Sequence, residues 1–499
     1  MASDFITIAK EAECEELVID IPSDLPHAEW REYCIYRVPK QLRKVNEEAY
    51  TPKLLSIGPF HRGKDDLKDM EMHKLKYLEN FLRRTKKSQA DLLKIIKVNE
   101  VKIRHCYSED CGLESDDFVK MILLDAIFII ELFVKDKEKK EEEEAKRKGE
   151  NYCEKESDYI LSHPWLGNGI LHDLIILENQ LPFFVLEELY RFALGDSSSC
   201  NNREQIKEDL KKEDSPFVEL SRKYFRRYVQ QQPLNVEEVK HFTDLLRYFF
   251  CPSKKHMEEW RNEESSNRQM EEWSSAERGL DTRFCATKLY DSGLKFKAVK
   301  DHSRVLLDIS VSPGCVRHFS CFDAFPRFSC LIACLPCIIC LICFPCLLRI
   351  QRILKVPQLV IDDDTETVFR NLMALEQCHY PSQTYICSYV LLLDRLVDTE
   401  KDVDLLIDKK VIINNIGCNA AVTTLINKLG DQIVEDKSCY YDLAKKLNQH
   451  YKYYPLNHIL ATLTKVYFGD FWRDTATIVG LVVLDFTFWN FLRFLVESI

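Results

Sequence analysis

Glycine and proline are scarce in this sequence, which contains only 14 glycines and 17 prolines in 499 residues. Tight turns and phosphate-binding loops depend on glycine, so the scarcity disfavours an all-β fold or a glycine-looped nucleotide binder and favours helices. The patterns G-x-x-x-x-G-K-[ST], G-x-G-x-x-G and G-x-S-x-G do not occur in the chain. The sequence therefore lacks the motifs of P-loop proteins, dinucleotide enzymes and α/β-hydrolases.

Positive charge is also in short supply. The 69 Lys and Arg residues against 80 Asp and Glu residues give a formal net charge of -11 at pH 7. A broad nucleic-acid surface needs clustered Lys and Arg, so we expect no nucleic-acid partner. Residues 1–20 are charged and lack the apolar core of a signal peptide. We expect the bulk of the chain to lie in the cytosol with reduced thiols.

Most of the chain has the pattern of helices. Apolar residues recur at helical spacing in 65–98, and 116–134 resemble a buried helix with acidic residues in its first turn. Residues 293–299, 304–311 and 353–361 show the alternation and β-branched content of strands. The predicted fold class is mainly α with a small β element, as a single large helical domain plus a C-terminal hydrophobic helix.

Changes in composition divide the chain into segments. The predicted segments are a loose acidic N-terminus (1–30), a helical domain (31–312 and 351–470) with polar loops at 136–150 and 252–279, a Cys-rich apolar insertion (313–350), and a C-terminal membrane helix (474–496). The charged run at 136–150 has no apolar periodicity, and a helical extension is the alternative to a loop there.

Several long motifs resemble one plant family in the same order. They include IYRVPKQLRKVNEEAYTPKLLSIGPFHRG (35–63), LLDAIFIIELF (123–133), DLIILENQLPFFVLEELY (173–190) and ILKVPQLVIDDDTETVFRNLMALEQC (353–378). Together they resemble the family catalogued as domain of unknown function 247, with UPF0481-like membrane-associated proteins. The resemblance extends over roughly residues 30–495.

The resemblance implies a plant-specific, largely helical protein with a C-terminal helix that anchors it to a membrane. The family has no assigned catalytic residues, and the association of some grass members with self-incompatibility implies recognition or signalling. We therefore expect a membrane-associated, non-enzymatic protein that acts through contacts with an unknown protein partner and has no cofactor. The alternatives are an enzyme of unknown reaction with a site near residues 58–63, and a soluble protein with a packed C-terminal helix.

The insertion at 313–350 departs from the family, in which the two flanking strands are joined by a short turn. Its cysteines are separated by apolar pairs, which offer none of the polar partners that a metal site needs. If the flanking strands pair, the segment must enter and leave a membrane on the same side. We expect contact with lipid and palmitate on some of its cysteines; a disordered insert without function is the alternative. The candidate acceptors are Cys334, Cys337, Cys340, Cys343 and Cys346.

The C-terminal tail is long enough to span a bilayer but has a marginal insertion energy. About ten Leu, Ile, Val and Phe residues contribute roughly -3 to -6 kcal/mol, and Asp485 returns about +2.5 to +3.5 kcal/mol. An amphipathic or buried helix competes with a membrane anchor. We expect an anchor, with the main domain facing the cytosol, mainly because the family ends this way.

A few polar residues are candidates for a pocket. His61 and Arg62 stand in the loop GPFHRG, and Glu178 and Asn179 precede Pro182 at a break between helices. An anion-binding or enzymatic pocket could use these four residues, although a structural role is the preferred interpretation. The cluster Asp362–Asp364 could hold Mg²⁺, but its position before a helix favours capping.

Overall fold

The computed structural model describes residues 32–149, 158–195, 215–228, 239–251, 285–299, 305–313, 352–435, 438–452 and 471–497. Helices dominate this part of the chain and strands are few and short. The prediction of a mainly α fold with a small β element is confirmed.

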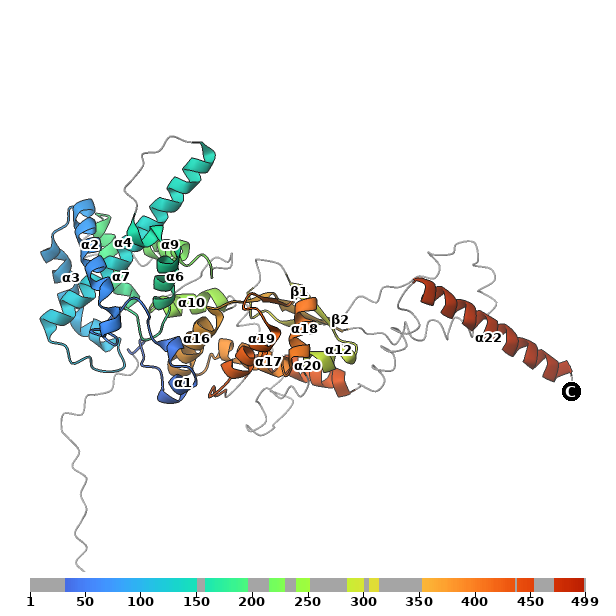
Figure 1. The fold of residues 1–499 in the computed structure, drawn as a ribbon. Helices are drawn as coiled ribbons and strands as arrows, with labels where there is room; N and C mark the ends of the chain where they lie inside the picture. Colours follow the sequence, from blue (N-terminus) through green and yellow to red (C-terminus); the bar gives the residue numbers. More distant parts are fainter. Residues whose placement is uncertain are drawn as a thin grey trace, which may run out of the picture.

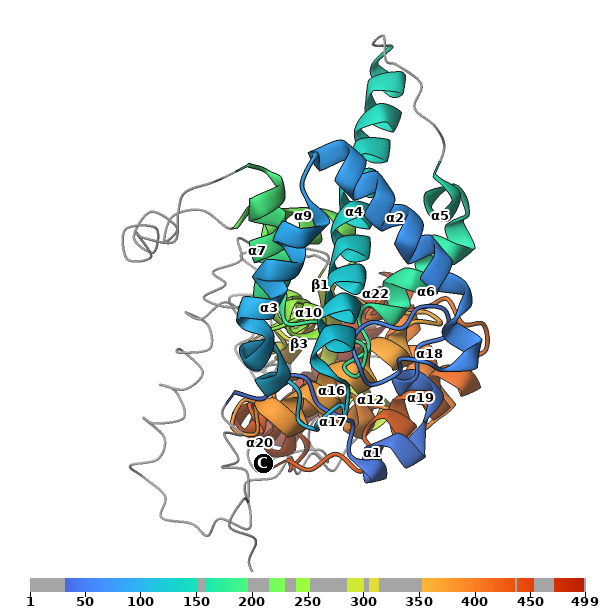
Figure 2. The same ribbon diagram turned by 90° about the vertical axis from the view of Figure 1, so that its left-hand side faces the viewer.

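The N-terminal half of the described chain is a helical bundle around the long helix α4. Figure 2 shows α4 between α2 and α3, with α7 and α9 beside them on one side and α5 and α6 on the other. Residues 126–130 of α4 are entirely buried. The bundle elements are α2 (Asp69–Thr85), α3 (Gln89–His105), α4 (Ser115–Lys148), α5 (Tyr159–Ser162), α6 (Pro164–Asp173), α7 (Phe183–Ala193) and α9 (Pro216–Tyr224), with a 3₁₀ turn at Asp65–Leu67. The preceding helix α1 (Lys40–Val45) and the 3₁₀ turn Glu48–Tyr50 pack instead against α16 (Thr365–His379) of the C-terminal half.

The C-terminal half packs helices around two small sheets. The longest helix in it, α16, contacts α10, α17 and α19, as well as the 3₁₀ turn Glu48–Tyr50. The elements are α10 (Phe242–Phe250), α12 (Ala286–Asp291), β1 (Lys295–Val299), β2 (Ser310–Pro313), β3 (Arg352–Pro357), β4 (Leu359–Ile361), α16 (Thr365–His379), α17 (Tyr385–Leu396), α18 (Glu400–Asp408), β5 (Ile412–Asn414), α19 (Asn419–Leu429) and α20 (Tyr441–Lys452).

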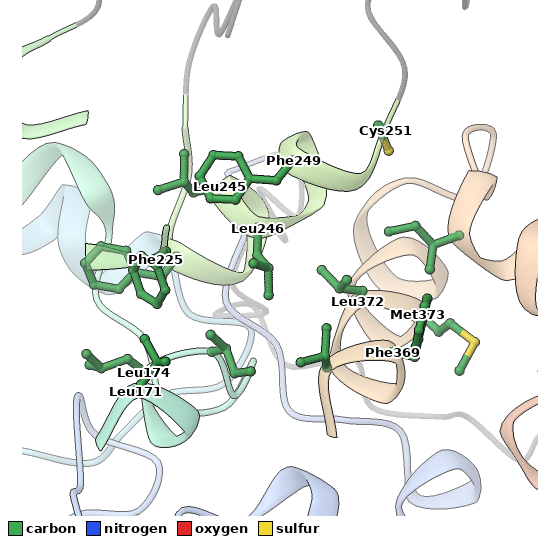
Figure 3. Packing of buried hydrophobic residues seen from close by; sticks show 14 of the residues in the cluster. Leu171, Leu174, Phe225, Leu245, Leu246, Phe249, Cys251, Phe369, Leu372 and Met373 are labelled. Atoms are coloured by element: carbon green, nitrogen blue, oxygen red, sulfur yellow. The ribbon is translucent and has the colours of Figure 1, made fainter. Parts of the chain in front are cut away.

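Helix α10 joins the two halves. Figure 3 shows its side chains Leu245, Leu246 and Phe249 between residues at the end of α6 and the face of α16 that carries Phe369 and Leu372. These apolar side chains belong to one buried cluster that runs through both halves. The two halves therefore share a hydrophobic core.

The sheets correct the predicted strands. β3 is central in a sheet of order β1-β3-β2, parallel to β1 and antiparallel to β2, and β4 pairs in parallel with β5. The strand predicted at 353–361 is split between the two sheets. The strand predicted at 304–311 is reduced to β2, because residues 305–309 enter the core without a strand partner.

Pairing between β2 and β3 places the two ends of the insertion together. Pro313 is the register partner of Arg352. The segment between them therefore begins and ends at the same end of the β2–β3 pair, as expected if the flanking strands pair. Its residues, including the five candidate palmitate acceptors, lie outside the described part of the chain.

The region 136–150, for which a polar loop and a helical extension were both expected, continues α4 as far as Lys148. Ion pairs at i,i+4 spacing, such as Lys137–Glu141 and Lys148–Glu144, support this extension. Gly149 ends the helix in a left-handed conformation (φ 73°). The extension projects beyond the bundle, as Figure 2 shows. Of the two alternatives, the structure therefore contains the helical extension.

The last described element, α22 (Phe471–Glu497), lies apart from the two halves (Figure 1). Its described large apolar side chains are between 49% and 69% exposed. In the structure α22 is therefore not packed into the body, contrary to the alternative of a packed C-terminal helix. No helix in the described ranges has both the length and the apolar character needed to cross a membrane. The predicted transmembrane helix at 474–496 is accordingly not supported.

Candidate functional site

The predicted pocket residues lie where residues 53–61 cross the bundle without forming a helix or strand. We refer to residues 53–61 as the buried loop. A loop inside a protein must find partners for its backbone N–H and C=O groups, because water cannot supply them. Side chains of α2, α4 and the turn after α6 supply them here.

Asp173, the last residue of α6, binds three successive backbone groups of the buried loop. Its carboxylate accepts hydrogen bonds from the N–H groups of Lys53, Leu54 and Leu55, at 2.9, 2.7 and 2.7 Å. Burial raises the pKa of Asp173, and these three bonds oppose that rise. The carboxylate thus acts as a fixed acceptor for the start of the loop.

The consecutive residues Glu178, Asn179 and Gln180 follow in the irregular stretch before α7, and all are buried. Asn179 Oδ1 accepts from the Ile57 N–H at 2.7 Å, and Asn179 Nδ2 donates to the Leu55 carbonyl at 2.9 Å. Gln180 Oε1 accepts from the Phe242 N–H at the start of α10, at 2.9 Å. The amide side chains therefore connect the buried loop, the break before α7 and α10.

Glu178 is at the centre of a cluster of positive charge. Its Oε1 accepts from the Val38 N–H at 2.8 Å. Its Oε2 lies 2.5 Å from the Arg43 guanidinium, 3.7 Å from Arg37 and 3.2 Å from His61 Nε2. Burial on its own raises the pKa of Glu178, but the contacts with His61 and Arg43 outweigh it and lower that pKa. Glu178 is therefore a carboxylate at neutral pH.

His61 faces Glu178 but is itself neutral. Burial lowers the pKa of His61, and the neighbouring Glu178 only partly offsets this effect. Within the described residues, His61 Nδ1 has no hydrogen-bond partner. Arg62, next in the chain, is exposed. Of the four predicted pocket residues, the structure brings His61, Glu178 and Asn179 together and leaves Arg62 at the surface.

Lys74 and Asp125 form a second buried charged contact at the same loop, which the sequence analysis missed. Lys74 Nζ contacts Asp125 Oδ1 at 2.7 Å and the Ser56 carbonyl at 2.5 Å. Asp125 Oδ2 accepts from the Gly58 N–H at 2.9 Å. Burial alone lowers the pKa of Lys74, but Asp125 and Glu71 raise it above the ordinary value, so the ammonium stays charged. An isolated Asp within the apolar run of α4 was the signal available in the sequence.

Gly58 shows how tightly the buried loop is held. Its φ of +70° lies in the left-handed region, and a Cβ placed on it would lie 2.6 Å from the Gln180 carbonyl oxygen. Glycine is therefore required both by backbone conformation and by space. The polar groups around the loop chiefly fix its path.

The acidic cluster before α16 forms ion pairs within the protein. Asp364 contacts His172 Nε2 and the Arg227 guanidinium, each at 2.7 Å, and Arg227 also contacts Asp362 at 2.8 Å. Asp362 Oδ1 accepts from the Thr365 hydroxyl at 2.8 Å, at the start of the helix. Across the described ranges, no group of three or more His, Cys, Asp or Glu residues is arranged to hold a metal ion.

The protein is mainly helical with two small sheets. The motifs at 35–63, 123–133 and 173–190, which carry the family resemblance, come together at the buried loop. Residues 35–486 match the family DUF247, described as "Plant protein of unknown function". The chain belongs to this family.

Two relatives from Arabidopsis thaliana carry the same class of name. The UPF0481 protein At3g47200 is 27% identical over 468 residues, which cover 91% of this chain and 84% of that protein. The putative UPF0481 protein At3g02645 is 24% identical over 518 residues, covering 92% of this chain and 91% of its own. No solved structure matches the chain.

Proposed function

We propose that this protein is a membrane-associated, non-enzymatic recognition component. In this proposal α22 contacts the acyl chains of a membrane, while the two packed halves face the cytosol and bind a protein partner. The exposed apolar surface of α22 is the observation that carries the proposal. Contact with lipid is proposed here, and not a crossing of the bilayer.

The distribution of apolar side chains around α22 favours lipid over a protein groove. Successive helix residues are rotated by about 100°, so the exposed apolar residues of α22 lie around most of the helix circumference and not along one stripe. A groove in a partner covers one stripe, whereas apolar side chains around most of a helix are suited to contact with acyl chains on several sides. The residues are Val479, Val482, Val483, Leu484, Phe486, Phe488, Trp489, Phe491 and Phe494.

The roles of the family-motif residues support recognition over catalysis. Asp173, Glu178 and Asn179 bind the protein's own backbone, and His61 is only 2% exposed. These groups stabilise the buried loop from inside, so a partner would be bound by the outer surface of the halves. Fatty acylation of the cysteines between 334 and 346 remains a separate prediction.

Flotation with phosphatidylcholine–phosphatidylserine vesicles tests the lipid contact. The full chain is expected to float with the vesicles, and a variant ending at residue 470 is expected to stay at the bottom of the gradient. The matched control is Val98→Ser with Val101→Ser on α3, which removes two exposed apolar side chains from the body and leaves α22 intact. Equal flotation of the full and shortened chains would refute lipid contact through α22.

Cross-linking mass spectrometry on plant membranes that carry the tagged full chain tests the recognition role. The proposal expects one reproducible partner protein linked to surface lysines of the two halves. Reproducible links only within the chain itself would contradict recognition without affecting the flotation result.

A further inference from the structure

The segment that precedes α1 runs beside the end of α3, and a cysteine stands on each side. Cys34 and Ile35 both donate their N–H groups to the Cys106 carbonyl at 2.9 Å. Ile35 also forms an isolated parallel bridge with Tyr107, and the Ser108 N–H donates to the Ile35 carbonyl at 3.0 Å. In this register Cys34 lies opposite Cys106. Paired strands lie about 4.7–4.9 Å apart, which falls within the range of Cα separations that a disulfide can bridge.

Both thiols are free, and both residues belong to the buried apolar cluster that runs through the two halves. Cys34 is 3% exposed and Cys106 is 9% exposed. The Cys106 thiol also contacts the Lys102 carbonyl at 3.3 Å. A buried free cysteine is ordinarily a small apolar side chain, but two facing thiols on hydrogen-bonded segments have a further chemistry open to them.

The surroundings make the two sulfurs unequal. The pKa of Cys106 is lowered, chiefly by a hydrogen bond with the Cys34 thiol. Burial opposes this lowering of the pKa, whereas the charges of Lys102 and Lys240 add to it. The hydrogen bond with Cys106 and burial together raise the pKa of Cys34. Cys106 is also the more exposed of the two residues, so a peroxide reaches its sulfur more readily than that of Cys34, and Cys106 is the sulfur better placed to react first.

We propose that Cys34 and Cys106 form a peroxide-sensitive thiol pair, in which Cys106 is oxidised first and Cys34 resolves it into a disulfide. The Cys106 thiolate attacks one oxygen of hydrogen peroxide and the O–O bond breaks. The products are a sulfenic acid on Cys106 and a hydroxide ion. The Cys34 sulfur then attacks the Cys106 sulfur, the S–O bond breaks, and the S–S bond forms. Overall, two thiols and one peroxide give one disulfide and two water molecules, with two electrons passing to the peroxide.

The disulfide would tie together three parts of the fold. Cys34 also accepts a hydrogen bond through its carbonyl from His241 Nε2 at 2.9 Å, at the start of α10. The bond to Cys106 adds a covalent link to the end of α3. Oxidation would therefore hold the segment around Cys34, which precedes α1, against both halves of the molecule.

The test treats the purified full chain with one to a few equivalents of hydrogen peroxide, followed by alkylation and peptide mass spectrometry. A cross-linked peptide pair containing Cys34 and Cys106 is expected, about 2 Da lighter than the sum of its reduced peptides. The matched control Cys418→Ser, at an exposed cysteine, should leave this pair unchanged.

Single substitutions test the order of the steps. In Cys34→Ser, dimedone should label Cys106 more strongly than in the unsubstituted chain, because the resolving thiol is gone. In Cys106→Ser, Cys34 should remain an unlabelled thiol. Thermal unfolding of both reduced variants shows whether they fold.

Two results would overturn the proposal. One is oxidation of Cys418 while Cys34 and Cys106 stay reduced in the folded protein. The other is dimedone labelling of Cys34 in Cys106→Ser with none on Cys106 in Cys34→Ser, which would reverse the assigned roles.

Discussion

The buried loop and α22 contrast in how regular their backbone is and how deeply their side chains are buried. Residues 53–61 form no helix or strand, yet most of them are buried among helices. α22 is a continuous helix of 27 residues, yet its described apolar side chains are exposed. Burial of irregular chain requires side chains that satisfy its backbone, whereas a helix satisfies its own backbone and can stand in an apolar solvent.

The substitution with the largest expected effect on stability, Asp125→Ala, tests whether the buried loop depends on its charged partners. Asp125→Ala leaves the Lys74 ammonium buried without this carboxylate and removes the acceptor of the Gly58 N–H. We expect a loss of about 3–5 kcal/mol in the free energy of unfolding, measured by chemical denaturation.

The matched control for Asp125→Ala is Glu79→Ala, because the Glu79–Arg83 pair is mostly exposed. It should change the free energy of unfolding by less than about 1 kcal/mol. Equal effects of the two substitutions would show that burial of the Lys74–Asp125 pair is unimportant.

Two glycines separate the effect of space from the effect of backbone conformation. Gly58 and Gly63 both have positive φ, +70° and +80°, but only at Gly58 does an added Cβ meet other atoms within 4 Å. Gly63→Ala should lower the free energy of unfolding by about 1 kcal/mol. Gly58→Ala should lower it by about 2–3 kcal/mol, because the Gln180 carbonyl must also move. Indistinguishable denaturation curves for the two variants would rule out the contact.

The junction at α10 should give the fold a pH dependence below neutrality. His241 is fully buried, and burial lowers its pKa from 6.5 to about 3. Between these values the unfolded chain binds a proton that the folded chain does not, so stability falls as pH falls below 6.5. The slope from this residue is at most about 1.4 kcal/mol per pH unit.

His241→Gln isolates this contribution. The variant should be less stable at pH 7, because His241 Nδ1 accepts from the Asp244 N–H at 3.3 Å and Nε2 contacts the Cys34 carbonyl. Its free energy of unfolding should change less steeply between pH 6.5 and 4.5 than that of the unsubstituted chain. Parallel slopes would show that His241 does not titrate on unfolding.

The smallest expected change in the free energy of unfolding is for a substitution in α22. Phe488→Ser should change the free energy of unfolding of the body by less than about 0.5 kcal/mol, because Phe488 is 58% exposed. Phe128→Ala, at a fully buried residue of α4, should lower it by about 3–5 kcal/mol. A large loss in Phe488→Ser would show that α22 packs on the body in solution.

The local elements were the most predictable part of the molecule. Apolar spacing located α2 and the buried stretch of α4, and family motifs indicated the fold class. The polar residues before Pro182 were interpreted as structural, and in the structure their side chains hydrogen-bond to backbone groups of the protein. The stretch 174–182 was less predictable: its apolar residues suggested a helix, but it is irregular because Asp173, Asn179 and Gln180 hydrogen-bond the buried loop and nearby backbone.

Tertiary contacts decided the rest. A pairing such as Lys74 with Asp125, or Glu178 with Arg43, joins residues far apart in the chain, and no local pattern encodes it. The same holds for the facing thiols of Cys34 and Cys106.

The sequence by itself determined that helices form, that the chain is acidic, and that two stretches are unusually apolar, because these properties depend on residue type and local spacing. Only the tertiary structure decided which carboxylates hold the buried loop, which cysteines meet, and that the ends of the insertion are neighbours. Those outcomes depend on long-range packing, in which each buried polar group must find its partner wherever the fold places one.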